Sequence, residues 1–101
     1  MTGQLVLTAD ERATVTGILA RSLPSGCRVF VFGSRAGGEV KPWSDLDLSL
    51  EGEEPLSLAT LAALADAFDE APLPWKVDLV DRSAVSAEFG AIIDRGKIAL
   101  I

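Results

Sequence analysis

Hydrophobic residues along the chain follow two spacings, one of which predicts helices and the other strands. Between residues 8 and 23 they recur every three or four positions, as on one face of a helix, and Pro24-Ser25-Gly26 then breaks the pattern. Thr8 and Glu11 form a capping-box pair, which marks where this helix begins. Residues 57–70 are also strongly helical in composition and spacing, so a second helix is expected there.

A third helix and several strands are expected in the rest of the chain. Ser83 is expected to cap the helix, which runs to about Asp94, and Gly96 is expected to close it. Short segments rich in β-branched and aromatic residues, or alternating between polar and apolar residues, predict strands. These are residues 27–32, 45–50 and 75–81, with 97–101 as a short fourth strand or a docked tail.

The order of the elements is therefore α-β-β-α-β-α, with a possible last strand. We find no linker, internal repeat or low-complexity tract, and 101 residues make one domain, which we assign to residues 1–101. Helices with an apolar face need a sheet beneath them, so the pattern predicts a two-layer α/β (α+β) domain.

Charge and composition narrow the classes of partner and of chemistry. The net charge of −6 argues against non-specific binding to nucleic acid and suits a basic protein partner. Cys27 is the one cysteine, so no internal disulfide is possible, and no apolar run approaches the ~20 residues of a membrane span. A cytoplasmic protein is expected. Histidine is absent, which excludes Ser-His catalysis and histidine-liganded zinc.

The strongest chemical signal is Gly33-Ser34 followed, after ten residues, by Asp45 and Asp47. Residues i and i+2 of a strand share a face, so the two carboxylates are expected to point the same way. Carboxylates that repel each other are stabilised by a divalent cation, and hard oxygen ligands favour Mg²⁺. A small-residue turn offers backbone N–H groups and a hydroxyl to phosphate. Asp78, within an apolar strand, is a third candidate ligand.

Each of these features also has a simpler structural interpretation. Asp45 and Asp47 could form the polar face of a half-solvated sheet, with Ser44 capping a turn. Asp78 could be a charge that protects a sheet edge from aggregation, and Gly33-Ser34 could mark an ordinary loop. The joint pattern is more specific than any single part of it.

Together these residues resemble the signature of the DNA polymerase β-type nucleotidyltransferase superfamily. Within it, the chain is most similar to the minimal nucleotidyltransferases, or MNT domains. The resemblance runs from about Val29 to Ile101 and rests on three segments: Gly33-Ser34-Arg35-Ala36, Ser44 to Leu48, and Val77 to Val80. It implies the small nucleotidyltransferase fold, with a mixed β-sheet of three to four strands packed with helices.

The resemblance also implies a role for each motif residue. Asp45 and Asp47 would hold two Mg²⁺ ions on the triphosphate of ATP, and Asp78 would join one metal and help activate the attacking hydroxyl. Gly33 and Ser34 would hold the β and γ phosphates. Arg35 and Ser44 complete the nucleotide-binding candidates, although Arg35 could equally contact a partner or remain a solvated loop arginine.

The function implied by the family is that of an antitoxin. It would transfer AMP from ATP to a hydroxyl, most commonly of tyrosine, on a HEPN-domain toxin with ribonuclease activity. This chain has no tyrosine, so modification of tyrosine would have to occur in trans. The alternative is a non-catalytic antitoxin that neutralises the ribonuclease by contact. A drug-modifying transferase shares the motif but usually needs an additional helical domain.

Two further features bear on activity and binding. Many minimal members carry a basic residue where this chain has Gly37, and Lys41 in the same loop could compensate for the lost charge. The large side chains Phe68, Trp75 and Phe89 are expected in the core. Trp43 lies in the loop beside the motif, where it could stack on a base, meet a partner or pack over the loop.

Overall fold

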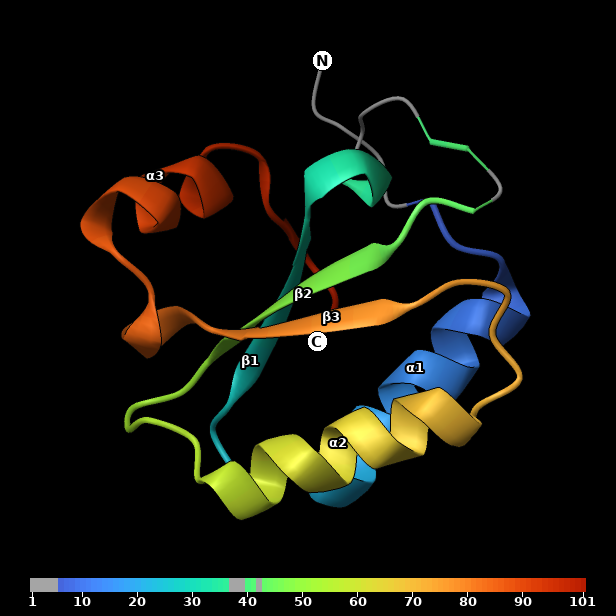
Figure 1. Cartoon of the computed structure of the whole chain (residues 1–101), viewed down its shortest axis with the longest axis horizontal. Helices are drawn as coiled ribbons and strands as arrows, with labels where there is room; N and C mark the ends of the chain where they lie inside the picture. The colour runs from blue at the N-terminus through green and yellow to red at the C-terminus, as the bar shows by residue number, and fades with distance from the viewer. Residues whose placement is uncertain (1–5, 37–39, 42) are drawn as a thin grey trace.

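A computed structural model of the chain describes residues 6–36, 40–41 and 43–101. Three α-helices, four strands and two short 3₁₀ helices follow one another in these residues (Figure 1). In chain order they are α1 (Ala9–Ser22), β1 (Arg28–Phe32), η1 (Gly33–Arg35), β2 (Leu46–Glu51), α2 (Leu58–Glu70), β3 (Val77–Asp81), η2 (Arg82–Ala84), α3 (Ala87–Gly96) and β4 (Ile98–Ala99). The predicted order of elements is confirmed, with 97–101 supplying both a two-residue strand and a docked end.

Side-chain caps determine where the helices begin. Thr8 and Glu11 form the predicted capping box at the start of α1, and the Ser57 hydroxyl accepts a hydrogen bond from the Thr60 N–H at the start of α2. The predicted cap of α3 is wrong. Ser83 lies in η2, where it donates to the Asp81 carboxylate, and Ser86 caps α3 instead. Because Asp81 accepts the hydrogen bonds of Ser83, this serine does not cap the helix, and α3 begins later.

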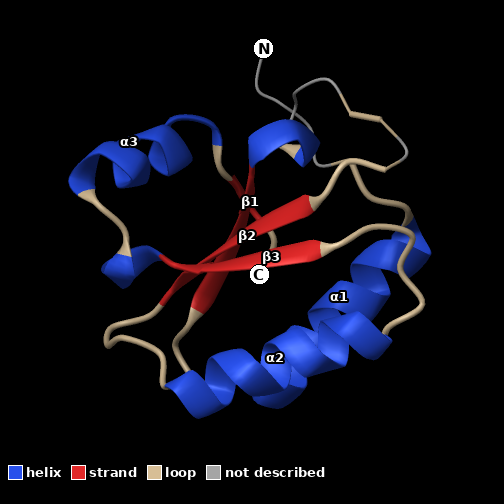
Figure 2. Cartoon of the chain, viewed as in Figure 1, coloured by secondary structure: helices blue, strands red, loops and turns tan. Residues whose placement is uncertain are grey.

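The sheet is mixed, as expected, and has the strand order β3-β2-β1-β4. β1 pairs antiparallel with both β2 and β4, whereas β2 and β3 run parallel. The parallel pair needs a long crossover connection, which α2 provides. As a result, the amino-terminal ends of β2 and β3 and the carboxyl-terminal end of β1 meet at one edge of the domain (Figure 2).

One face of the sheet forms the core with α1 and α2. The alternate residues of β1 and β2 on this face are fully buried, and helix side chains pack against them. This core consists of Val15, Ile18, Leu19, Val29, Val31, Leu46, Leu48, Leu50, Leu64, Phe68, Trp75 and Leu100. The expected burial of Phe68 and Trp75 is confirmed.

The opposite face is covered in part by α3 (Figure 1). Phe89 of α3 meets Phe32 of β1 edge-on, with ring centroids 6.0 Å apart, but remains 37% exposed, so its predicted core position is wrong. Lys97 bonds to both Glu51 and Asp94, and Arg82 pairs with Asp94, which ties α3 to the sheet. These ion pairs add to the apolar packing of α3, in which Ile93 is fully buried, whereas Asp78 of β3 stays exposed on this face.

The helices described are short. None of them, within residues 6–36, 40–41 and 43–101, is both long and apolar enough to cross a membrane.

Candidate functional site

Two of the predicted carboxylates lie side by side on neighbouring strands. Asp47 of β2 is the register partner of Asp78 of β3, and residues paired in this way in a parallel sheet point to the same face. On its other side, Asp47 is paired with Phe32, the last residue of β1. Gly33 follows directly, so the sheet itself brings the Gly-Ser turn and both carboxylates together.

Gly33 allows this close approach. Its φ angle is +75°, a conformation that residues with a Cβ rarely adopt. A Cβ built at this position would collide with the carboxylate oxygen Oδ2 of Asp47. The missing side chain therefore serves both the turn and the space around Asp47.

The environment of Asp47 favours its protonated form. Burial raises its pKa to about 6 from the ordinary value of 3.8, and the negative charge of Asp78, a hydrogen bond with Asp78 and the charge of Asp45 add to the effect. Asp78 itself lies exposed on the edge strand of the sheet. Two adjacent carboxyls that resist joint ionisation form a pair that a divalent cation would stabilise.

Asp45 lies beside the Asp47–Asp78 pair. It is exposed, lies one residue before β2, and its charge reaches Asp47. In the part of the chain that the structure describes, no three Asp, Glu, Cys or His side chains already converge closely enough to hold a metal ion. The arrangement is thus a preformed Asp47–Asp78 pair with Asp45 beside it, an all-oxygen donor set that fits Mg²⁺.

Ser34 and Arg35 continue the turn as η1, but they face different surroundings. Ser34 is half-buried beside Gly33, whereas Arg35 is only 4% exposed. The Arg35 guanidinium donates to the backbone carbonyls of Ser44 and Val6 and lies over the Trp75 ring. A solvated loop arginine, one of the sequence-based alternatives, is therefore wrong.

Ser44 forms a local turn before β2. Its hydroxyl accepts a hydrogen bond from the Lys41 N–H, and its own N–H donates to the Lys41 carbonyl. The Lys41 ammonium lies 5.6 Å from the centre of the Trp43 ring, and Trp43 is 70% exposed. Packing of Trp43 over the loop is thus limited, and a large aromatic surface lies near Asp45. Gly37 lies outside the described residues.

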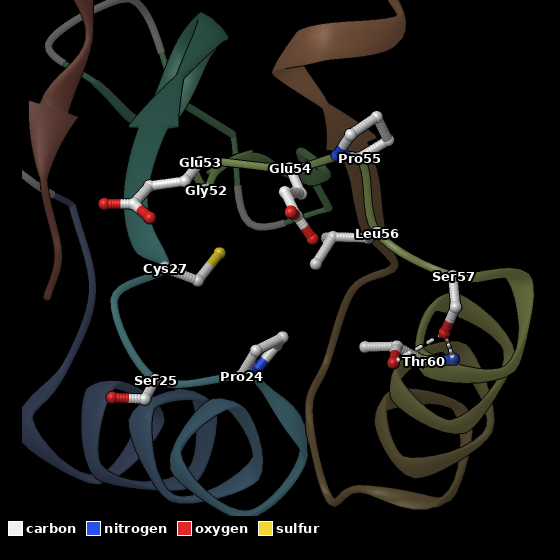
Figure 3. A pocket seen from close by; sticks show the side chains of 10 residues that line it. All are labelled: Pro24, Ser25, Cys27, Gly52, Glu53, Glu54, Pro55, Leu56, Ser57 and Thr60. Atoms are coloured by element: carbon white, nitrogen blue, oxygen red, sulfur yellow. Dashed lines mark hydrogen bonds between the residues drawn. The ribbon is translucent and has the colours of Figure 1, made fainter.

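A pocket of about 300 Å³ lies beside the start of β1 and the end of β2 (Figure 3), at the end of these strands away from Asp47. Cys27, before β1, and Gly52, after β2, contribute to its wall, as does the start of α2. Burial raises the pKa of the Cys27 thiol, which keeps it in its unreactive protonated form. None of the site residues predicted from the sequence, all of which the structure describes, lines this pocket.

The stacking of Arg35 on Trp75 could not be predicted from the sequence. The two residues are forty positions apart, and no local spacing connects them. The one signal in the sequence was that Trp75 lies just before the strand that carries Asp78. A residue in that position lies close to the candidate site once the strand has joined the sheet.

We expect the stability of the metal-free protein to fall as the pH rises from about 4 to 7. Because the pKa of Asp47 is raised to about 6, its proton stabilises the folded state fully below 3.8, and this contribution is lost as the pH passes 6. After allowance for solvent screening, the expected loss is about 1–2 kcal/mol. The lowered pKa of Asp94, about 2, acts only at more acidic pH.

Denaturant unfolding in EDTA across this range, with the Asp47→Asn variant as comparison, checks this expectation. The variant should lack the decline between pH 4 and 7. An equal decline in both proteins would assign it to other groups.

Comparison with known proteins agrees with this geometry. The family model described as "Nucleotidyltransferase domain" matches residues 14–99, which include the Gly33-Ser34 turn and all three aspartates. The chain is 43% identical over 90 residues to "Probable protein adenylyltransferase MntA" of Haemophilus influenzae, a match that covers 89% of this chain and 78% of that protein.

Solved structures share the fold. One chain of a toxin–antitoxin structure with AMP-PNP superposes with a TM-score of 0.73 at 22% identity, covering 89% of this chain and 72% of its own. A second match, at TM-score 0.64 and 20% identity, comes from a complex of a tri-AMPylated Shewanella oneidensis HEPN toxin with an MNT antitoxin. It covers 89% of this chain and 68% of its own. Both confirm the predicted arrangement of helices and mixed sheet.

Proposed function

This chain belongs to the nucleotidyltransferase domain family and is a nucleotidyltransferase, and we propose that it transfers AMP from ATP, with Mg²⁺ and with release of pyrophosphate, to a tyrosine hydroxyl of a HEPN-domain toxin. It would act in this way as an antitoxin. The observation that carries the proposal is the register pairing of Asp47 with Asp78 beside the Gly33 turn. The cytoplasm, where the single cysteine stays reduced and ATP and Mg²⁺ are present, is the compartment that suits it.

The donor set supports a magnesium site. Asp45, Asp47 and Asp78 would hold two Mg²⁺ ions, whose charge would offset the burial of Asp47 and its repulsion by Asp78, the two largest causes of its raised pKa. Bound Mg²⁺ neutralises charge that develops on the attacking and leaving oxygens of a phosphoryl group. Asp78, exposed on the edge strand, is the carboxylate best placed to meet an incoming hydroxyl and to take up its proton.

The Gly33-Ser34 turn would bind the triphosphate. Because Gly33 has no side chain, the backbone beside Asp47 stays open to close approach by phosphate oxygens. The half-buried Ser34 hydroxyl lies in the same turn and could donate to the same group. We include these two residues as the phosphate contacts of the site.

Four observations support a protein acceptor in trans. The relative from H. influenzae is named as a protein adenylyltransferase, and the S. oneidensis structure holds an AMPylated HEPN toxin beside its MNT antitoxin. The chain has no tyrosine to modify in itself. Asp78 is exposed on the edge strand β3, so a partner could place a hydroxyl beside it.

A second candidate function is neutralisation by contact alone. It is favoured by the net charge of −6, which suits a basic partner surface, and by Gly37, which stands where many minimal members have a basic residue. In that case the carboxylates would contribute little beyond surface charge.

The two functions differ in whether the toxin stays inhibited after this chain has been removed from it. The HEPN toxin is incubated with this chain and Mg²⁺–ATP, separated from it under denaturing conditions, refolded, and assayed for ribonuclease activity. Transfer of AMP predicts that inhibition survives separation and is absent when the Asp47→Asn variant replaces the chain. Full recovery of ribonuclease activity after separation from the unmodified chain would contradict AMP transfer and support contact.

A further inference from the structure

The guanidinium of Arg35 is buried between segments that carry the site. Its side chain follows Gly33-Ser34 directly and is 4% exposed. Arginine keeps its charge when buried, so its position must be stabilised by hydrogen bonds and stacking. Nε donates to the Ser44 carbonyl at 2.9 Å, Nη1 donates to the Val6 carbonyl at 3.1 Å, and the group lies 4.5 Å from the centre of the Trp75 ring.

Two of these contacts hold residues that adjoin the carboxylates. Ser44 immediately precedes Asp45, and Trp75 comes three residues before Asp78. The two segments are also joined directly, because the Leu46 N–H donates to the Lys76 carbonyl at 2.9 Å. Arg35 therefore connects the phosphate turn, the entry to β2 and the entry to β3 through a single side chain.

We propose that Arg35 is a positioning residue that sets Asp45 relative to the Asp47–Asp78 pair. Its hydrogen bond to the Ser44 carbonyl fixes the backbone from which Asp45 projects, and its stacking on Trp75 anchors the same backbone to the entry of β3. A side chain with so little exposed surface, whose donors point to protein carbonyls, has little to offer a phosphate. The expected effect of Arg35 on kcat rests on the proposed function, whereas its expected effect on metal binding does not.

The first test compares Arg35→Met and Arg35→Lys with the control Arg28→Met. Arg28 also lies over an aromatic ring, that of Phe30, but at the opposite end of β1. Loss of a supporting residue is expected to lower kcat for AMP transfer about 10- to 100-fold. KM for ATP should stay within about threefold, because uniform substrate binding is not removed. The Arg35→Lys variant should not recover the lost kcat, since an ammonium cannot stack on the ring and donate to two carbonyls in the way a guanidinium does.

The second test measures binding of Mn²⁺ by electron paramagnetic resonance, without nucleotide or partner. Both Arg35 variants are expected to bind Mn²⁺ about 10-fold more weakly than the unmodified chain and the Arg28→Met control. If the chain transfers no AMP at all, the proposed function fails but this measurement still tests Arg35. Unchanged Mn²⁺ affinity in variants that remain folded would overturn the positioning role.

A milder variant guards against loss of folding. Trp75→Phe keeps an aromatic ring beneath the guanidinium but weakens the cation–π contact, so it should shift kcat and Mn²⁺ affinity in the same direction as Arg35→Lys, to a smaller extent. A phosphate-binding Arg35 would give the opposite pattern. KM for ATP would rise, lysine would restore it, and Trp75→Phe would have no effect, and that pattern would overturn the proposal.

Discussion

Replacing Asp47 with asparagine is expected to reduce AMP transfer by about a thousandfold or more, because a metal-binding carboxylate contributes several kcal/mol of transition-state stabilisation. The substitution keeps the size and shape of the side chain, so β2 and its pairing with β3 should persist. It also removes a charge that Asp78 and Asp45 oppose. The metal-free variant should therefore be more stable than the unmodified chain at pH 8, although it is inactive.

The matched control for this change is Asp66→Asn. Asp66 is exposed on α2, which packs against the other face of the sheet from Asp47. Transfer rates, unfolding midpoints and partner binding are measured for all three proteins. Loss of transfer in Asp47→Asn with partner binding retained supports a catalytic site. Equal transfer by both variants would show that Asp47 is not part of the catalytic machinery.

Gly33→Ala is expected to lower transfer about 100-fold, because displacement of a reacting group by about 1 Å has effects of this size. The new methyl group meets the Asp47 carboxylate, which must move. The positive φ angle adds a backbone cost of about 1–2 kcal/mol in stability. Activity and stability should therefore fall together.

Gly26→Ala separates these two causes. Gly26 has a similar positive φ angle of 86°, but a Cβ there would meet no atom within 4 Å. This variant should lose about 1 kcal/mol of stability and keep its full rate of transfer. If Gly33→Ala behaves like Gly26→Ala, the contact with Asp47 does not matter for catalysis.

Local sequence patterns predicted the elements well, because each depends on nearby residues. The capping pair Thr8 and Glu11, the apolar spacing of α1 and α2 and the alternation in β2 all act within a few positions. The cap of α3 was misplaced because Asp81 accepts the hydrogen bonds of Ser83 in a tight turn, and Ser86 caps the helix instead. Phe89 was assigned to the core because burial is the default for a large apolar side chain, but α3 places it against Phe32 on the other face of the sheet, where it stays 37% exposed.

The residues of the candidate site also differ in how far local sequence patterns could predict their arrangement. The expected shared direction of Asp45 and Asp47 came from the two-residue repeat of a strand, but β2 begins at Leu46, so this stays a prediction for Asp45. The pairing of Asp47 with Asp78 requires the parallel register of β2 and β3, which no local pattern specifies. The burial of Arg35 against Trp75 depends on three segments meeting in space, and composition gave equal support to a solvated side chain.

The most direct test of the account follows the α and γ phosphates of ATP. The purified HEPN toxin is incubated with this chain, Mg²⁺ and ATP labelled at one position or the other, and is then separated and counted. Transfer of AMP predicts that the α label stays covalently attached to the toxin, that the γ label does not, and that Asp47→Asn attaches neither. Attachment of the γ label, or a stable complex in which the unmodified chain leaves the toxin unlabelled, would contradict the proposed reaction.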